Sequence, residues 1–112
     1  MPKSVNIRGL RRDYQRLGRQ LSVIEWICQG SVMKRSYQRP AGKGLKTYGP
    51  YYSWTRKVDN KTVTVALSLA QYHAMKSAIA KHRRMESVLD RMRRLSEQAI
   101  FVTTLGVLKR NR

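Results

Sequence analysis

The clearest structural signal in the chain is a pair of β-rich runs, YYSWTRKV at residues 51–58 and KTVTVALS at residues 61–68, which are separated by Asp59 and Asn60. Aromatic, β-branched and hydroxyl side chains favour strands, and Asp and Asn tolerate the positive φ that a two-residue turn requires. The sequence therefore predicts a tight β-hairpin over residues 51–68.

A two-residue turn pairs Val58 with Lys61, and this pair sets every other pair of the hairpin. Because side chains alternate between the faces of a strand, one face is predicted to be mainly apolar and to pack into the core. Its cross-strand pairs are Tyr52 with Leu67, Trp54 with Val65, and Arg56 with Val63. The opposite face is rich in hydroxyl groups and consists of Tyr51, Ser53, Thr55, Lys57, Thr62, Thr64, Ala66 and Ser68.

The residues before the hairpin predict one more strand and a long loop. Residues 31–37, SVMKRSY, have the composition of a strand, which would complete a three-stranded antiparallel sheet. Residues 38–50 contain three glycines and two prolines and predict a loop that displays cations. A loop of this length is usually either functional or disordered.

Two segments with helical spacing flank the predicted sheet. Residues 8–29 repeat apolar side chains in a heptad pattern, and Gly30 follows as a helix stop. Ser68 and Gln71 form a capping box at the start of a second helix over residues 69–100. The apolar stripe of the first helix is Leu10, Tyr14, Leu17, Leu21, Ile24 and Cys28, and that of the second is Tyr72, Met75, Ile79, His82, Met85, Leu89 and Met92.

These elements predict an α+β fold in a single domain of residues 1–112. An N-terminal helix (8–29) precedes a β insert (31–68), a long C-terminal helix (69–100) packs antiparallel on the first helix, and a basic tail (101–112) follows. The chain length of 112 residues fits one domain with one modest core.

The charge of the chain is strongly positive and unevenly distributed. There are 24 Lys and Arg residues against 6 Asp and Glu residues, a formal net charge of +18. Between Trp26 and Met85 the only acidic residue is Asp59. Such a charge exceeds what a small domain needs for solubility and attracts polyanions. The composition therefore argues against an enzyme for small neutral substrates.

No catalytic, metal or membrane-spanning pattern is found in the sequence. Cys28 is the single cysteine, which excludes an intramolecular disulfide and a multi-cysteine zinc site. His73 and His82 do not have the spacing of a helical metal pair, and the few acidic residues are scattered. We expect no enzymatic activity, no cofactor and no metal. Because there is no signal peptide or long apolar run, we expect a cytoplasmic protein, compatible with association with the nucleoid.

The remaining signal is an interleaving of basic, aromatic and hydroxyl residues. Lys and Arg neutralise phosphates, hydroxyl groups hydrogen-bond to phosphate oxygens, and aromatic rings can stack on unpaired bases. Tyr52 and Trp54 are expected in the core, whereas Tyr48 and Tyr51 are expected at the interface. The predicted nucleic-acid interface comprises Lys34, Arg35, Arg39, Lys43, Lys46, Tyr48, Tyr51, Ser53, Thr55, Lys57, Thr62, Lys81, Arg83 and Arg84.

About two-thirds of the chain resembles a family of small uncharacterised bacterial and archaeal proteins encoded near transposases and integrases. The matching segments are GSV (30–32), KRSY (34–37), GPYYS (49–53) and KHRRM (81–85). The resemblance implies an association with a mobile genetic element or with recombination. The loop of that family usually contains cysteines suited to zinc, but the loop here begins QRPAGKG (38–44) and has none, so no zinc site is carried over. The hairpin-then-helix order is also similar to the arm-site DNA-binding domains of tyrosine recombinases, whose three-stranded sheet enters the major groove.

Three functional hypotheses follow. The leading one is a non-enzymatic protein that binds double-stranded DNA. The second is a structured-RNA or ribonucleoprotein subunit, because Arg and exposed Tyr also suit RNA. The third is a helical protein-interaction adaptor, in which Met75, Met85 and Met92 dock a partner helix or a second copy of the chain. A homodimer through the long helix is compatible with all three.

Overall fold

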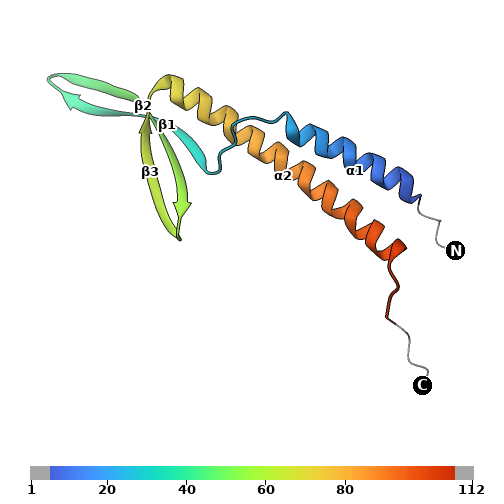
Figure 1. Cartoon of the computed structure of the whole chain (residues 1–112). Helices are drawn as coiled ribbons and strands as arrows, with labels where there is room; N and C mark the ends of the chain where they lie inside the picture. The colour runs from blue at the N-terminus through green and yellow to red at the C-terminus, as the bar shows by residue number, and fades with distance from the viewer. Residues whose placement is uncertain (1–5, 108–112) are drawn as a thin grey trace. The chain divides into compact units, whose positions relative to one another are not determined.

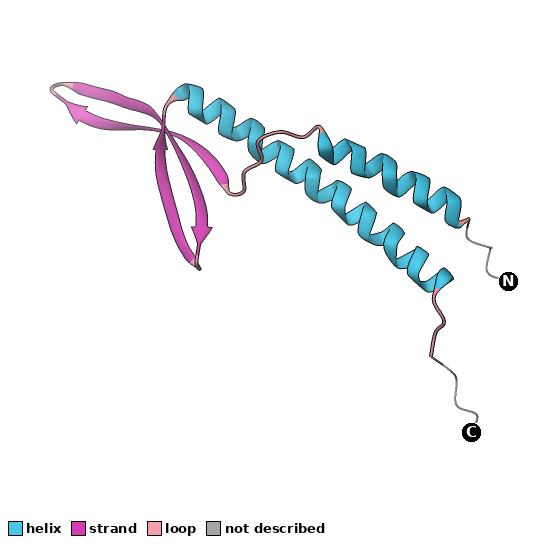
Figure 2. Cartoon of the chain, viewed as in Figure 1, coloured by secondary structure: helices cyan, strands magenta, loops and turns pink. Residues whose placement is uncertain are grey.

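The computed structural model describes residues 6–107, which form two helices and one three-stranded sheet (Figure 1, Figure 2). The order of elements is α1 (Ile7–Ser22), β1 (Ser31–Ala41), β2 (Gly44–Val58), β3 (Lys61–Leu67) and α2 (Leu69–Thr103). The predicted α+β fold is therefore confirmed.

The chain divides into two compact units. The helical unit contains the residues up to Ile24 together with those from Arg84 onward, and the sheet unit contains Glu25–Arg83. Helix α2 contributes its first part to the sheet unit and its second part to the helical unit. The single-domain organisation of residues 1–112 stays a prediction.

Helix α1 begins at a polar cap and is shorter than predicted. The Asn6 side chain accepts hydrogen bonds from the backbone N–H groups of Arg8 and Gly9, at 3.1 and 3.2 Å. The helix ends at Ser22, so the predicted end at residue 29 is wrong. The heptad pattern continues past Ser22, but β-branched residues with lower helix propensity follow, and Trp26 has a φ of 57° that a right-handed helix does not allow.

In the helical unit, α1 and the second part of α2 run antiparallel, as predicted. The first turns of α1 lie beside the last turns of α2, and further along, the Met92 methyl group lies 3.9 Å from where a Cβ atom of Gly18 would be (Figure 1). Leu17 and Val88 are buried. Gly18 and Met92 thus lie at the contact between the two helices.

Helix α2 confirms the predicted capping box and continues beyond the predicted end. The Ser68 N–H donates to Gln71 Oε1 at 2.9 Å, and the Gln71 N–H donates to Ser68 Oγ at 3.1 Å. The helix runs to Thr103, so the tail does not begin at residue 101 as predicted. The basic tail residues Lys109, Arg110 and Arg112 lie outside the described residues. The predicted stripe of α2 is half-buried or buried along its length, and Ala78 and Val88 add to it.

The hairpin between β2 and β3 has the predicted register, pair by pair. Val58 pairs with Lys61 and Trp54 with Val65, and the other pairs of the hairpin follow without a register shift. Asp59 and Asn60 have φ values of 51° and 65°, as a turn with two left-handed residues requires. The antiparallel sheet has the order β1-β2-β3.

The predicted loop over residues 38–50 is wrong, because these residues form the outer part of a second hairpin, between β1 and β2. β1 continues to Ala41, β2 begins at Gly44, and the turn between them contains Gly42 with a φ of 59°. Pro40 is compatible with a strand here because β1 is an edge strand, which has no hydrogen-bonding partner on one side. The glycines and prolines of this segment therefore do not indicate a loop. They mark a turn, an edge strand and an irregularity of the sheet.

The apolar face of the sheet packs on the start of α2 and on the segment that precedes β1. The Tyr52 ring lies 4.8 Å from the Tyr72 ring, between centroids. The Trp54 Nε1–H donates to the Gln29 carbonyl at 2.8 Å, and the Cys28 N–H donates to the Ala78 carbonyl at 3.2 Å. Tyr52 and Trp54 therefore pack in the core of the sheet unit, as the register predicts.

Candidate nucleic-acid interface

The face of the sheet that carries Thr55 is called the polar face below. Its composition follows from the register, since residues that pair across strands share a face. On β3 and the second half of β2, this face is the hydroxyl-rich face predicted from the sequence. The members of the polar face are Ser31, Met33, Arg35, Tyr37 and Arg39 on β1, Lys46, Tyr48, Tyr51, Ser53, Thr55 and Lys57 on β2, and Thr62, Thr64 and Ala66 on β3.

An irregularity in β2 places Tyr48 and Tyr51 on the same face. Two residues three positions apart would face opposite sides of an uninterrupted strand. Between Arg35 and Tyr37 the register shifts, so that Gly49 and Pro50 together stand opposite one residue of β1. The Gly49–Pro50 peptide is cis, and a Cβ atom at Gly49 would lie 2.9 Å from the Arg35 carbonyl oxygen. The bulge therefore keeps the tyrosines together.

Tyr37 is the central ring of a three-tyrosine stack on the polar face. Its ring centroid lies 5.9 Å from that of Tyr48 and 5.5 Å from that of Tyr51, with interplanar angles of 22° and 23°. Tyr37 and Tyr51 expose 40% and 50% of their surface, so the stack is open to solvent at its edges. Tyr37 is not among the predicted interface residues, and the Gly49–Pro50 pair between Tyr48 and Tyr51 was the available signal.

Two cations lie over this stack. The Arg39 guanidinium carbon is 5.0 Å from the Tyr37 ring centroid and 6.0 Å from that of Tyr48, and Lys46 Nζ is 5.3 Å from that of Tyr48. Arg39 and Lys46 are direct cross-strand partners, and both are exposed. The ring contacts hold the two charged groups close to each other on the outer part of the sheet.

The Tyr37 hydroxyl also changes the acidity of its neighbour. A hydrogen bond with Tyr37 raises the pKa of Tyr51 above its ordinary value of about 10. Tyr51 therefore keeps its O–H donor at neutral and mildly alkaline pH. A neutral phenol near Arg39 adds a hydrogen-bond donor to the cluster and no negative charge.

The hydroxyl side chains form the second half of the polar face. Thr55 and Thr64 are cross-strand partners whose Oγ1 atoms are 3.0 Å apart, and Lys57 pairs with Thr62 beside them. Lys57 and Thr62 are exposed, whereas Ser53 and Thr55 are half-buried. This part of the face therefore presents one cation among neutral hydrogen-bonding groups.

The structure brings only part of the predicted interface together. Lys34 pairs with Tyr52 and so lies on the opposite face of the sheet, and Lys43 lies in the β1–β2 turn. Lys81, Arg83 and Arg84 lie on α2 and not on a strand, and Lys81 is half-buried. The predicted residues that share the polar face are Arg35, Arg39, Lys46, Tyr48, Tyr51, Ser53, Thr55, Lys57 and Thr62.

Arg56 shows how a basic residue fits on the apolar face. Its guanidinium carbon lies 4.1 Å from the Trp54 ring centroid, and one of its terminal nitrogens is buried without a hydrogen-bond partner among residues 6–107. The contact with Trp54 and burial of the aliphatic stem make Arg56 part of the core packing.

Two carboxylates of the helices, those of Asp13 and Asp90, have arginine partners close by. Asp13 pairs with Arg12 and Arg16 at 3.9 and 3.4 Å, and Asp90 pairs with Arg94 at 2.9 Å. In the sheet, the sole carboxylate is that of Asp59, which lies in the β2–β3 turn. The positive charge of the polar face is therefore not neutralised by acidic residues of the sheet.

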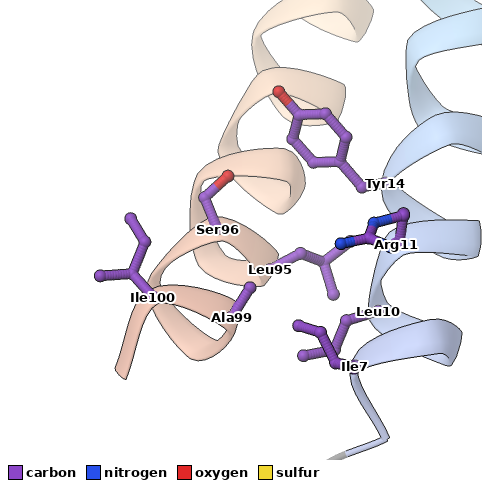
Figure 3. A pocket seen from close by; sticks show the side chains of 8 residues that line it. All are labelled: Ile7, Leu10, Arg11, Tyr14, Leu95, Ser96, Ala99 and Ile100. Atoms are coloured by element: carbon purple, nitrogen blue, oxygen red, sulfur yellow. The ribbon is translucent and has the colours of Figure 1, made fainter. Parts of the chain in front are cut away.

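The helical unit contains an open cavity of about 290 Å³ between the start of α1 and the end of α2 (Figure 3). Arg11, Tyr14 and Ser96 are its polar residues, and the others are apolar. Figure 3 shows the side chains of Ile7, Leu10 and Leu95 between the two helices. Nothing in the structure indicates an occupant. The lining residues are Ile7, Leu10, Arg11, Tyr14, Leu95, Ser96, Ala99 and Ile100.

Two other kinds of site are not found in the part of the chain that the structure describes. No three side chains of the metal-ligating types lie together within residues 6–107. Neither helix over these residues has an apolar stretch long enough to cross a membrane.

Comparisons with known proteins yield no relative for this chain. No protein-family model, no curated protein and no solved structure matches it. The resemblance to the transposase-associated family, and the link to mobile elements that it implies, therefore stay predictions.

Proposed function

We propose that this chain is a non-enzymatic protein that binds double-stranded DNA through the polar face of its sheet. The observation that carries the proposal is the segregation of the two faces. One face gathers exposed cations, phenols and hydroxyl groups, while the other packs on α2 through Tyr52 and Tyr72. A sheet that packs on a helix through one face and exposes such side chains on the other face is suited to docking on a polyanion.

The side chains of the polar face match the chemistry of a phosphate backbone. Arg35, Arg39, Lys46 and Lys57 supply charges that displace condensed counterions. The hydroxyl groups of Ser53, Thr55 and Thr62 supply hydrogen bonds to phosphate oxygens. Affinity is therefore dominated by electrostatics and depends strongly on salt.

The arrangement of the tyrosines favours a duplex over a single strand. Unpaired bases bind by stacking on open aromatic faces. The Tyr37 ring stacks with the rings of Tyr48 and Tyr51, and Arg39 lies over it, so this ring is already engaged in contacts within the sheet. The stack instead offers hydroxyl edges beside two cations, which suits phosphates more than bases.

The shape of the sheet favours DNA over RNA. A β-ribbon fits the major groove of B-form DNA, whereas the major groove of A-form RNA is deep and too narrow for protein side chains to read. The outer part of the sheet is such a ribbon, because β3 pairs only with Tyr52–Val58 of β2. RNA binding is the alternative that the experiment below distinguishes.

Fluorescence anisotropy with three probes of one sequence tests this proposal: a DNA duplex of about two helical turns, its single strand, and an RNA hairpin. We expect the duplex to bind most tightly. Lys57→Ala is expected to weaken duplex binding, whereas Arg93→Ala, which removes an exposed cation from α2, is expected to have a smaller effect. Tighter binding of the single strand or of the RNA hairpin, or equal effects of the two variants, would contradict the proposal.

The adaptor hypothesis has less support. Met92, one of the three methionines assigned to partner binding, already packs against α1 at Gly18. A protein partner and a homodimer through the long helix stay predictions.

A further inference from the structure

We propose that the outer ribbon of the sheet reads base edges in the major groove, with Arg39 as the guanine-reading residue and Lys46 as its neighbour. The outer ribbon is defined as residues 37–41 of β1 paired with residues 44–48 of β2. This inference rests on the proposed function, and it assigns sequence discrimination to one part of the polar face.

The outer ribbon is the part of the sheet that fits into a groove. It has two strands, because the pairs of β3 end at Tyr52. Figure 1 shows it projecting from the three-stranded part toward the Gly42–Lys43 turn. A two-stranded ribbon enters a major groove about 12 Å wide, whereas a third strand makes the remainder of the sheet wider. The three-stranded part is then left to lie along the phosphates.

Arg39 is held in place while its hydrogen-bond donors stay free. Its guanidinium lies over the rings of Tyr37 and Tyr48, and within residues 6–107 it forms no ion pair with a carboxylate. Contact with a ring uses the face of a guanidinium, and the five N–H donors lie in its plane. A pre-positioned guanidinium of this kind can donate two parallel hydrogen bonds to O6 and N7 of guanine, which is the commonest specific contact to DNA.

Lys46 extends the contact to the adjacent base pair or phosphate. It is the cross-strand partner of Arg39, and its ammonium group lies over Tyr48. Directly opposed side chains of a sheet are about 5 Å apart, which is comparable to the rise of about 3.4 Å between base pairs. Arg39 and Lys46 can therefore contact neighbouring base pairs in one groove.

The rest of the polar face has a different character. Lys57 is exposed among the hydroxyl groups of Thr55 and Thr62 and has no ring contact. A flexible point charge among hydroxyl groups suits phosphate oxygens, which carry no sequence information. Lys57 is therefore the matched control for Arg39, with the same charge on the same face.

Selection from a pool of duplexes with randomised sequence, followed by sequencing, tests the inference on the full chain. Wild type is expected to enrich a motif in which one guanine is preferred about tenfold over other bases. Arg39→Lys keeps the charge and loses the paired donors. The affinity of this variant for the pool should therefore stay within about threefold of the wild-type affinity, while its preference for guanine over other bases falls below about threefold. Lys57→Ala should weaken pool binding and leave the motif intact. Circular dichroism verifies that each variant is folded.

The outcomes separate this inference from the proposed function. If wild type binds the pool but enriches no motif, or if Arg39→Lys keeps the motif, the reading role of Arg39 is wrong and DNA binding stands. The reading role is equally wrong if Lys57→Ala abolishes the motif. If wild type does not bind the pool, both proposals fail.

Discussion

Tyr37 and Tyr51 stack with their ring centroids 5.5 Å apart and an interplanar angle of 23°. They belong to different strands and are not direct cross-strand partners, since Tyr37 pairs with Tyr48 and Tyr51 with Arg35. The contact exists because the bulge at Gly49–Pro50 brings Tyr51 back to the face that Tyr37 occupies. The bulge therefore determines the chemistry of the polar face.

The first prediction concerns the ionisation of Tyr51. Its pKa is raised, mainly by the hydrogen bond with Tyr37, so Tyr37→Phe should lower it toward the ordinary value of about 10. NMR titration of ring-labelled tyrosine measures the change, and Tyr14→Phe, in the helical unit, is the control. Because the folded pKa lies above the unfolded one, the stabilisation is complete below pH 10 and is lost as pH rises through the folded pKa. An unchanged Tyr51 titration in Tyr37→Phe would contradict the bond.

The second prediction compares the two tryptophans. Trp54 is half-buried and its indole N–H donates to the Gln29 carbonyl, whereas Trp26 exposes 78% of its surface. Trp54→Ala should lower the free energy of unfolding by about 3 kcal/mol, and Trp26→Ala should change it by less than about 0.5 kcal/mol. Urea denaturation followed by circular dichroism measures both values. An effect of Trp54→Ala as small as that of Trp26→Ala would contradict the packing of Trp54 in the core of the sheet unit.

The third prediction concerns the entry into β1. Gly30 has a φ of 103°, and a Cβ atom there would collide with the Thr55 carbonyl oxygen and the Trp54 indole nitrogen. Gly30→Ala should therefore destabilise the protein by at least about 2 kcal/mol. Gly44 has open space around the position of a Cβ atom, so Gly44→Ala is the control and should cost less than about 0.5 kcal/mol. Thermal unfolding measures both, and a stable Gly30→Ala variant would contradict this packing.

The sequence predicts those parts of the fold that depend on local chemistry. The Asp59–Asn60 turn sets the register of β2 and β3, and Ser68 with Gln71 sets the start of α2, because each acts over a few residues. The end of α1 could not be predicted in this way. Ile24 and Cys28 continue the heptad pattern, but the Cys28 N–H donates to Ala78 of α2, a tertiary contact that no local pattern contains.

The candidate site was predicted from composition and is only partly assembled by the structure. The hydroxyl-rich half followed from strand alternation, so Ser53, Thr55 and Lys57 share a face as predicted. The tyrosine half depended on a bulge within a predicted loop, and Tyr37 was therefore missed. Strand alternation also gives the reason that Lys34 lies on the opposite face, where it pairs with Tyr52.

The fourth prediction concerns the salt dependence of duplex binding. Five cations lie on the polar face or in the adjoining turn, Arg35, Arg39, Lys43, Lys46 and Lys57. If each neutralises one phosphate, the logarithm of affinity should fall against the logarithm of salt concentration with a slope of about −4.5. Lys57→Ala should reduce that slope by about 1. Anisotropy titrations between about 50 and 200 mM salt measure both slopes. A slope near zero would exclude phosphate-dominated binding, whereas a much steeper slope unchanged by Lys57→Ala would assign the contacts to the basic helices.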